Sequence, residues 1–129
     1  MTMTLLDQSL SIPVLDGLQA QGDLIVIPYA VVASSVKRWS DWVPVPPQGV
    51  ELLRGGAGGN AHTLVAEPGT CLWTNRVTDF DMLAIGMFRA SAVVYLLHPE
   101  HGASGCAPGT YVVRRQREHE GRRSRLVCD

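Results

Sequence analysis

Ala92-Val93-Val94-Tyr95-Leu96-Leu97-His98 is the stretch that decides the fold. Its β-branched, aromatic and aliphatic residues form a short apolar run that ends at a proline, which is typical of a buried strand. Leu24-Ile25-Val26-Ile27, stopped by Pro28, has the same character. Many short strands separated by Gly/Pro turns, without a capped helical pattern, predict an all-β fold, either a small barrel or a sandwich. We expect its core to contain Ile25, Ile27, Leu64, Val94, Leu96 and Val112.

The chain is long enough for one domain with one core, since it has 129 residues, 46% of them hydrophobic and 18% charged. We predict an amino-terminal arm over 1–20, a β domain over 21–120 and a basic tail over 121–129. Within the domain, 104–109 is expected to be a loop. The net charge of −1 does not indicate a nucleic-acid or membrane partner.

Cysteine usage and the amino terminus predict where the protein acts. Met1 to Asp7 lacks the positive and long apolar segments of a secretory signal, and no apolar run approaches a membrane span. Cys71, Cys106 and Cys128 contain no Cys-x-x-Cys pair, which favours reduced thiols. We therefore expect a cytoplasmic protein.

Three histidines lie in two turn-like segments, His62 after a glycine-rich loop and His98 and His101 in His98-Pro99-Glu100-His101-Gly102. Imidazoles from separate segments can converge on one divalent metal such as zinc or iron. Glu100 could then orient a ligand or act as general base, whereas the alternative is an exposed turn carboxylate. The glycine loop itself lacks the lysine and the following helix of a phosphate-binding loop.

A resemblance adds to the case for this histidine site. The stretch from Gln21-Gly22-Asp23 through Pro28, the 55–62 loop, the 98–102 motif and the ending Tyr111 to Glu118 together resemble a family of small uncharacterised bacterial and phage-type proteins. That family carries a Gly-Glu-x-Thr-Gly-His-Ala-His loop, a His-x-Glu-His-Gly motif and a Tyr-x-Val-x-Arg-Gln-Arg-Glu-Tyr ending. This chain keeps three of the four motif histidines. It departs from the pattern at Gly56, Gly58, Asn60 and His119.

If the family site holds metal through four histidines, Asn60 replaces one ligand here and is a poor substitute for zinc. A three-histidine site with an open position would suit hydrolytic or oxygen chemistry. The short strands and scattered histidines also bear a looser similarity to cupins, which is an analogy of fold alone.

Two function classes remain open. We favour a binding or assembly module without catalytic activity or cofactor, which docks on a protein partner or on a second copy. Its partner surface would include Trp39, Trp42 and the arginine-rich end. The segment 114–129 contains six arginines and three acidic residues. Arg122, Arg123 and Arg125 in that end lack aromatic neighbours, which makes nucleic acid an unlikely partner. The alternative is the metal-binding, cupin-like enzyme at His62, His98 and His101.

Overall fold

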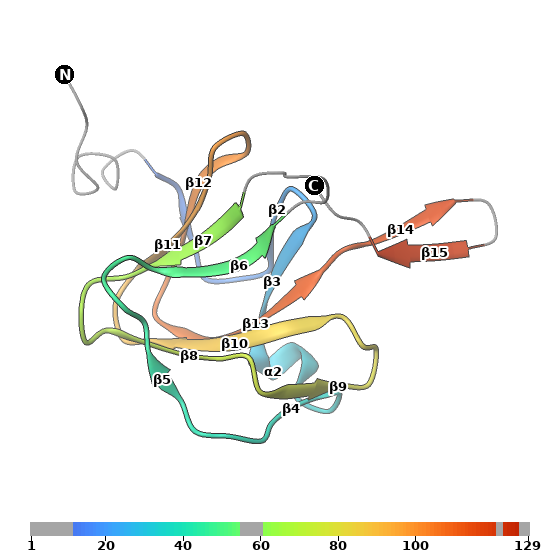
Figure 1. Ribbon diagram of the computed structural model, residues 1–129, viewed down its shortest axis with the longest axis horizontal. Helices are drawn as coiled ribbons and strands as arrows, with labels where there is room; N and C mark the ends of the chain where they lie inside the picture. Colours follow the sequence, from blue (N-terminus) through green and yellow to red (C-terminus); the bar gives the residue numbers. More distant parts are fainter. Residues whose placement is uncertain (1–11, 55–60, 121–122, 127–129) are drawn as a thin grey trace.

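A computed structural model describes residues 12–54, 61–120 and 123–126, and it describes side chains over 12–53 and 61–116. Two sheets face each other as layers of a sandwich (Figure 1). This confirms the all-β prediction and selects the sandwich, because neither sheet closes into a barrel within the described residues. The first sheet has five strands in the order β1 (Val14–Leu15), β12 (Gly102–Cys106), β11 (Val94–His98), β7 (Ala61–Val65) and β6 (Val50–Arg54).

The second sheet has six strands and carries a short helix and a two-stranded pair on its outer side. A four-residue helix, α2 (Tyr29–Val32), follows β3 directly. A two-stranded pair, β4 (Val36–Arg38) and β9 (Val77–Asp79), lies with it. Near the carboxyl end, β14 (Arg117–Glu120) pairs with β15 (Arg123–Leu126). The order in the six-stranded sheet is β2 (Gln19–Gln21), β3 (Leu24–Pro28), β13 (Gly109–Arg115), β10 (Ala84–Ala90), β8 (Cys71–Thr74) and β5 (Val43–Pro44).

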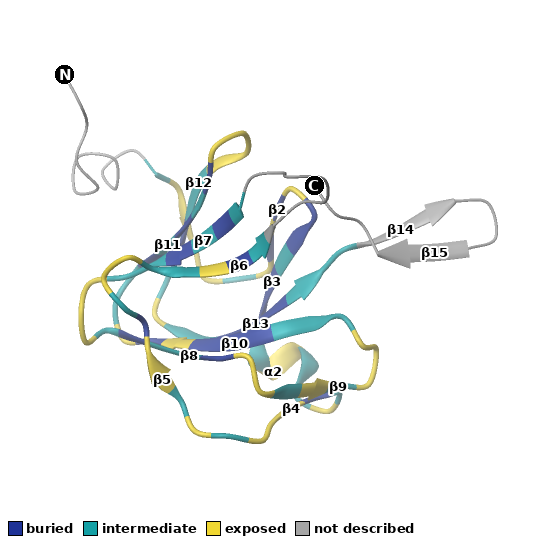
Figure 2. Ribbon diagram, viewed as in Figure 1, coloured by how far each residue is buried: buried dark blue, intermediate teal, exposed yellow. Residues whose placement is uncertain are grey.

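Both faces of the six-stranded sheet are covered, which explains why its central strands read as continuous apolar runs. In β13, Tyr111 and Val113 point into the core between the sheets, whereas Val112 points to the other face. There Val112 packs with Met87 and Val36 beneath α2 and β4. Figure 2 shows the buried residues concentrated along β10, β13 and the strands opposite them.

Five of the six expected core residues are buried, and Ile25 is only partly buried. The alternation along β3 explains the exception. Leu24 and Val26 face the core between the sheets, so Ile25 lies on the opposite face beside the exposed Ala20 of β2. The buried members of the expected set are Ile27, Leu64, Val94, Leu96 and Val112.

The expected loop at 104–109 is wrong in its first half, because residues up to Cys106 form β12. The sequence Gly-Ala-Ser-Gly-Cys has no large apolar side chain and therefore gives no strand signal. Its small residues let β1 pair alongside in parallel. A Cβ on Gly105 would lie 2.8 Å from Cγ2 of Val14. Part of the expected amino-terminal arm thus belongs to the sandwich, through β1 and β2, while residues 1–11 lie outside the described part.

No helix in the described residues is long and apolar enough to cross a membrane.

Candidate functional site

The structure brings the three motif histidines together. His62 on β7 lies beside His98 at the end of β11, because the two strands pair up to Leu97 opposite Thr63. The ring centres of His62 and His98 are 4.3 Å apart, and those of His98 and His101 are 4.4 Å apart. His62 and His98 are buried, whereas His101 is exposed on the turn before β12. The cluster therefore runs from the sandwich interior to its surface.

Gln21 and Asp23, on either side of the β2–β3 turn, complete this cluster. The Gln21 side-chain amide donates to the carbonyl oxygens of Leu96 (2.9 Å) and Gly102 (3.1 Å). Those two acceptors fix the orientation of the amide, so its Oε1 faces Nδ1 of His62 at 2.9 Å and accepts a hydrogen bond from it. Nε2 of His62 is then directed to Asp23, whose Oδ1 lies 3.5 Å away.

Sequence reasoning gave Gln21 and Asp23 no role in the site. The available signal was their position, with two polar residues on either side of a turn glycine immediately before a buried strand. Gly22 has φ of 59°, which permits the tight turn. Both polar side chains are buried, and buried polar groups are expensive unless they make specific contacts.

His98 holds the turn that follows it. Its Nδ1 accepts hydrogen bonds from the backbone N–H groups of Glu100 and His101, each at 3.1 Å. A nitrogen that accepts two such bonds carries no proton, so the ring proton of neutral His98 is on Nε2. Glu100 is exposed on this turn.

Among the described residues, no group of three or more His, Cys, Asp or Glu side chains is arranged to hold a metal ion. The rings of His62 and His101 are stacked, with planes 6° apart and centres 6.0 Å apart. A metal needs nitrogen lone pairs, which lie in the ring planes, to meet at one point. Ligation by His62, His98 and His101 would thus require the rings to turn, and it stays a prediction.

The buried thiols are not reactive groups. Cys71 and Cys106 are free and buried, as the expectation of reduced cysteines requires, and Cys128 lies outside the described residues. Burial raises the pKa of Cys71 to about 11. Burial, with the neighbouring Cys71, raises the pKa of Cys106 to about 12. Both remain thiols at neutral pH, which disfavours them as nucleophiles.

A second feature is formed around the two tryptophans predicted to contact a partner. The guanidinium groups of Arg38 and Arg89 each stand over the Trp42 ring, 4.9 Å from its centre. Arg76 stands 5.4 Å from the centre of the Trp39 ring, and Trp39 is 59% exposed. We call this surface the tryptophan–arginine face and define it as Lys37, Arg38, Trp39, Trp42, Arg76 and Arg89.

Three elements assemble this face. Trp39 and Arg76 meet because the backbone N–H of Trp39 donates to the carbonyl of Arg76 at 3.0 Å. Arg89 comes from β10, across β8 from the segment that begins after Trp42. Arg38 could be linked to the tryptophans from the sequence, because it precedes Trp39. Arg76 and Arg89 could not, because only strand pairing brings them next to Trp39 and Trp42.

The face is an unusual concentration of positive charge. It holds four of the five Lys and Arg residues that precede residue 114. Within the described part of the chain, none of these four forms an ion pair with a carboxylate. A hollow of about 280 Å³ lies here, lined by Tyr29, Lys37, Arg38, Trp42, Met87, Arg89 and Thr110.

The predicted basic end is described only in part. Arg114, the first arginine of this end, has a side chain only 12% exposed, and it pairs with Asp79 at 2.9 Å. It stabilises the β9–β10 turn rather than a docking surface. Arg122 lies outside the described residues. Arg123 and Arg125 belong to β15, which pairs with β14, and their side chains are not described.

The comparisons with known proteins give a family and no activity. Residues 20–116 match the family described as Domain of unknown function (DUF8820), which covers most of the chain. The chain therefore belongs to that family. Neither the curated proteins nor the solved structures include a match to this chain.

Proposed function

We propose that this member of the DUF8820 family is a non-catalytic docking module that binds an acidic segment of a protein partner through the tryptophan–arginine face. One observation carries the proposal. Four cationic side chains gather on this face, three of them over tryptophan rings, and none of them is paired with a described carboxylate.

Stacking prepares an arginine for binding. A guanidinium over an aromatic face loses part of its conformational freedom before the partner arrives, while its N–H donors remain available at the edge. Carboxylates accept two such donors at once, which makes arginine a selective ligand for acidic side chains. Trp and Arg are also the residues that most often dominate binding energy at protein interfaces.

The charge balance favours an acidic peptide over nucleic acid. Residues 1–113 have a net charge of −4, from five basic and nine acidic residues. Such a body disfavours a long polyphosphate, whose binding depends on many simultaneous phosphate contacts. A short acidic segment meets only the local positive face. A second copy of this chain is a related candidate partner, because its acidic body could meet the basic carboxyl end.

A labelled glutamate-rich peptide is the probe for this proposal. We expect fluorescence anisotropy to detect binding at low salt and its loss at high salt, since exposed charges are screened beyond about 10 Å at 0.1 M. Arg89→Gln should weaken binding. Arg115→Gln is the matched control and should leave binding unchanged. It removes the same charge at the far end of β13, whereas Arg89 on β10 pairs with Thr110 near the start of β13. Equal effects of the two substitutions would show that only net charge matters.

Self-association is measured in parallel by size exclusion at low and high salt. A salt-sensitive dimer that persists in Arg89→Gln but disappears when residues 122–129 are deleted would assign assembly to the carboxyl end. We expect these contacts to form in the cytoplasm, where the two buried thiols would remain reduced.

The second candidate is a metal-binding, cupin-like domain with hydrolytic or oxygen chemistry. The observation that favours it is the contact among the His62, His98 and His101 rings, together with the donation from His62 Nδ1 to Gln21. Metal-ligating histidines commonly donate their other nitrogen in this way. Elemental analysis of untagged protein tests it. Stoichiometric zinc or iron that is lost in His62→Ala would establish the site, with Glu100 as the candidate base, and metal-free protein that takes up neither ion would remove it.

A further inference from the structure

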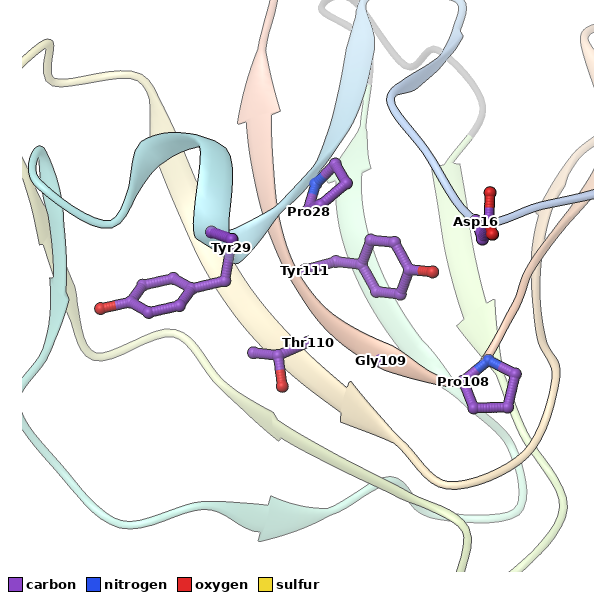
Figure 3. A pocket seen from close by; sticks show the side chains of 8 residues that line it. Asp16, Pro28, Tyr29, Pro108, Gly109, Thr110 and Tyr111 are labelled. Atoms are coloured by element: carbon purple, nitrogen blue, oxygen red, sulfur yellow. The ribbon is translucent and has the colours of Figure 1, made fainter.

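A second hollow adjoins the tryptophan–arginine face. It has a volume of about 340 Å³ and lies where β3 passes into α2 beside the start of β13 (Figure 3). Tyr29 and Thr110 line both this hollow and the one at Trp42. The two hollows are therefore adjacent, with Tyr29 and Thr110 between them, and we refer to the pair as the groove. The remaining lining residues of the second hollow are Asp16, Pro28, Ala30, Pro108, Gly109 and Tyr111.

Pro28 and Tyr29 supply the accessible apolar side chains in the middle of the groove, and Tyr111, which is only 2% exposed, closes the second hollow on its core side. Tyr111 is fixed at both ends, since its hydroxyl donates to the Ala107 carbonyl at 2.7 Å and its ring stacks on Phe88 at 5.1 Å. Pro28 is directly opposite Tyr111 in the β3–β13 register. Burial, with smaller contributions from Cys106 and Asp16, raises the pKa of Tyr111, so its hydroxyl remains a neutral donor. Figure 3 shows Pro28, Tyr29 and Tyr111 close to one another.

The two ends of the groove carry opposite charges. Asp16 is the one charged side chain among the residues that line the second hollow, and it is exposed. Lys37, Arg38 and Arg89 line the hollow at the other end. A ligand that spans both hollows therefore meets the Asp16 carboxylate, then the Pro28 and Tyr29 rings, then three cations.

From this gradient we infer that the partner segment is extended and proline-rich, with acidic side chains at the end over Trp42 and a Lys or Arg at the end beside Asp16. The inference rests on the proposed function and specifies its ligand. Aromatic-lined grooves bind proline-rich segments because the polyproline II conformation is already formed in the free peptide and little entropy is lost on docking. The opposite charges set the orientation of the segment.

Three labelled peptides of equal length test the inference by anisotropy. The first has a glutamate run, a proline-rich middle and a terminal arginine. The second replaces the prolines with glycine and serine, and the third replaces the arginine with glutamate. We expect the first to bind about tenfold more tightly than the second, because the free peptide is preorganised. It should bind about two- to fivefold more tightly than the third, the range of an exposed ion pair.

Variants of the protein assign each part of the peptide to its end of the groove. Asp16→Asn should weaken the first peptide and slightly strengthen the third, because it removes the repulsion between Asp16 and the glutamate of that peptide. Asp16→Lys should make the third peptide the better ligand. Tyr29→Phe, with its ring retained, controls for folding, and Tyr29→Ala should remove the preference for prolines. Arg89→Gln should weaken all three peptides.

Equal binding of the three peptides, with Arg89 still required, would overturn the proline-rich inference and leave the acidic docking face in place. Failure of all three to bind the folded protein would overturn both.

Discussion

The guanidinium of Arg89 stands 4.9 Å from the centre of the Trp42 ring, although Arg89 lies on β10 and Trp42 lies just before β5, far apart in sequence. Strand pairing through β8 brings them together, and Arg38 reaches the same ring from β4. As a result, the arginine side chains are held in place on a surface where they have no described carboxylate partner. Binding of an acidic segment is the use that this arrangement supports best.

Trp39→Ala tests whether the exposed tryptophan contributes to binding. Its ring is 59% exposed, so the free energy of unfolding should change by less than about 0.5 kcal/mol. Its removal frees Arg76, and affinity for the glutamate-rich peptide should fall by about 1 kcal/mol. Urea denaturation and anisotropy separate the two quantities. An unchanged affinity would exclude Trp39 from the docking surface.

Gln21→Ala should be strongly destabilising for a residue outside the apolar core. It removes bonds to Leu96, Gly102 and His62 and leaves their polar atoms without this partner, at a cost of about 2–4 kcal/mol. Ala20→Ser, at the exposed neighbouring position, is the control and should cost little. Similar urea midpoints for the two variants would show that the Gln21 hydrogen bonds contribute little to the stability of the fold.

Leu96→Ala tests the placement of the central strand. Leu96 is fully buried on β11, so truncation should cost about 2–5 kcal/mol. Val31→Ala on α2, where the side chain is 68% exposed, should change stability by less than about 0.5 kcal/mol. A thermal melt that Leu96→Ala leaves unchanged would contradict the described core.

The buried thiols predict a loss of stability in alkali. The pKa values of Cys71 and Cys106 rise from 9.0 to about 11 and about 12 in the folded protein. Because the folded state binds these protons more tightly, its advantage is complete below about pH 9 and declines as pH rises toward 11–12. Urea midpoints in a Cys128→Ser background should fall over that window, and less so in Cys106→Ala. A decline of the same size in Cys106→Ala would assign the effect to other groups.

Sequence alone predicted the all-β class because short apolar runs such as 92–97 and 24–27, separated by Gly/Pro turns, indicate strands in whichever sheet they pair. It also indicated that His62 and His98 could meet, since each lies at the end of a recognisable strand. It missed β12, whose Gly-Ala-Ser-Gly-Cys sequence is selected by the close approach of β1 and not by strand propensity.

The partners of the site residues depend on pairing between distant strands, which one sequence does not encode locally. Arg89 reaches Trp42, and Arg114 reaches Asp79, only through the register of the six-stranded sheet. The role of Gln21 depends on the second sheet, because two of its acceptors are carbonyl groups on β11 and β12. Composition marked Trp39 and Trp42 as surface candidates but could not place cations over them.

Charge reversal of the tryptophan–arginine face tests whether this face binds acidic segments. Arg38→Glu combined with Arg89→Glu should leave the sandwich folded, because both side chains are exposed. Anisotropy is measured with a glutamate-rich and a lysine-rich peptide of equal length. We predict that the variant loses affinity for the glutamate-rich peptide by about tenfold or more and gains affinity for the lysine-rich one. A folded variant that binds the glutamate-rich peptide as tightly as the unmodified protein would contradict the account.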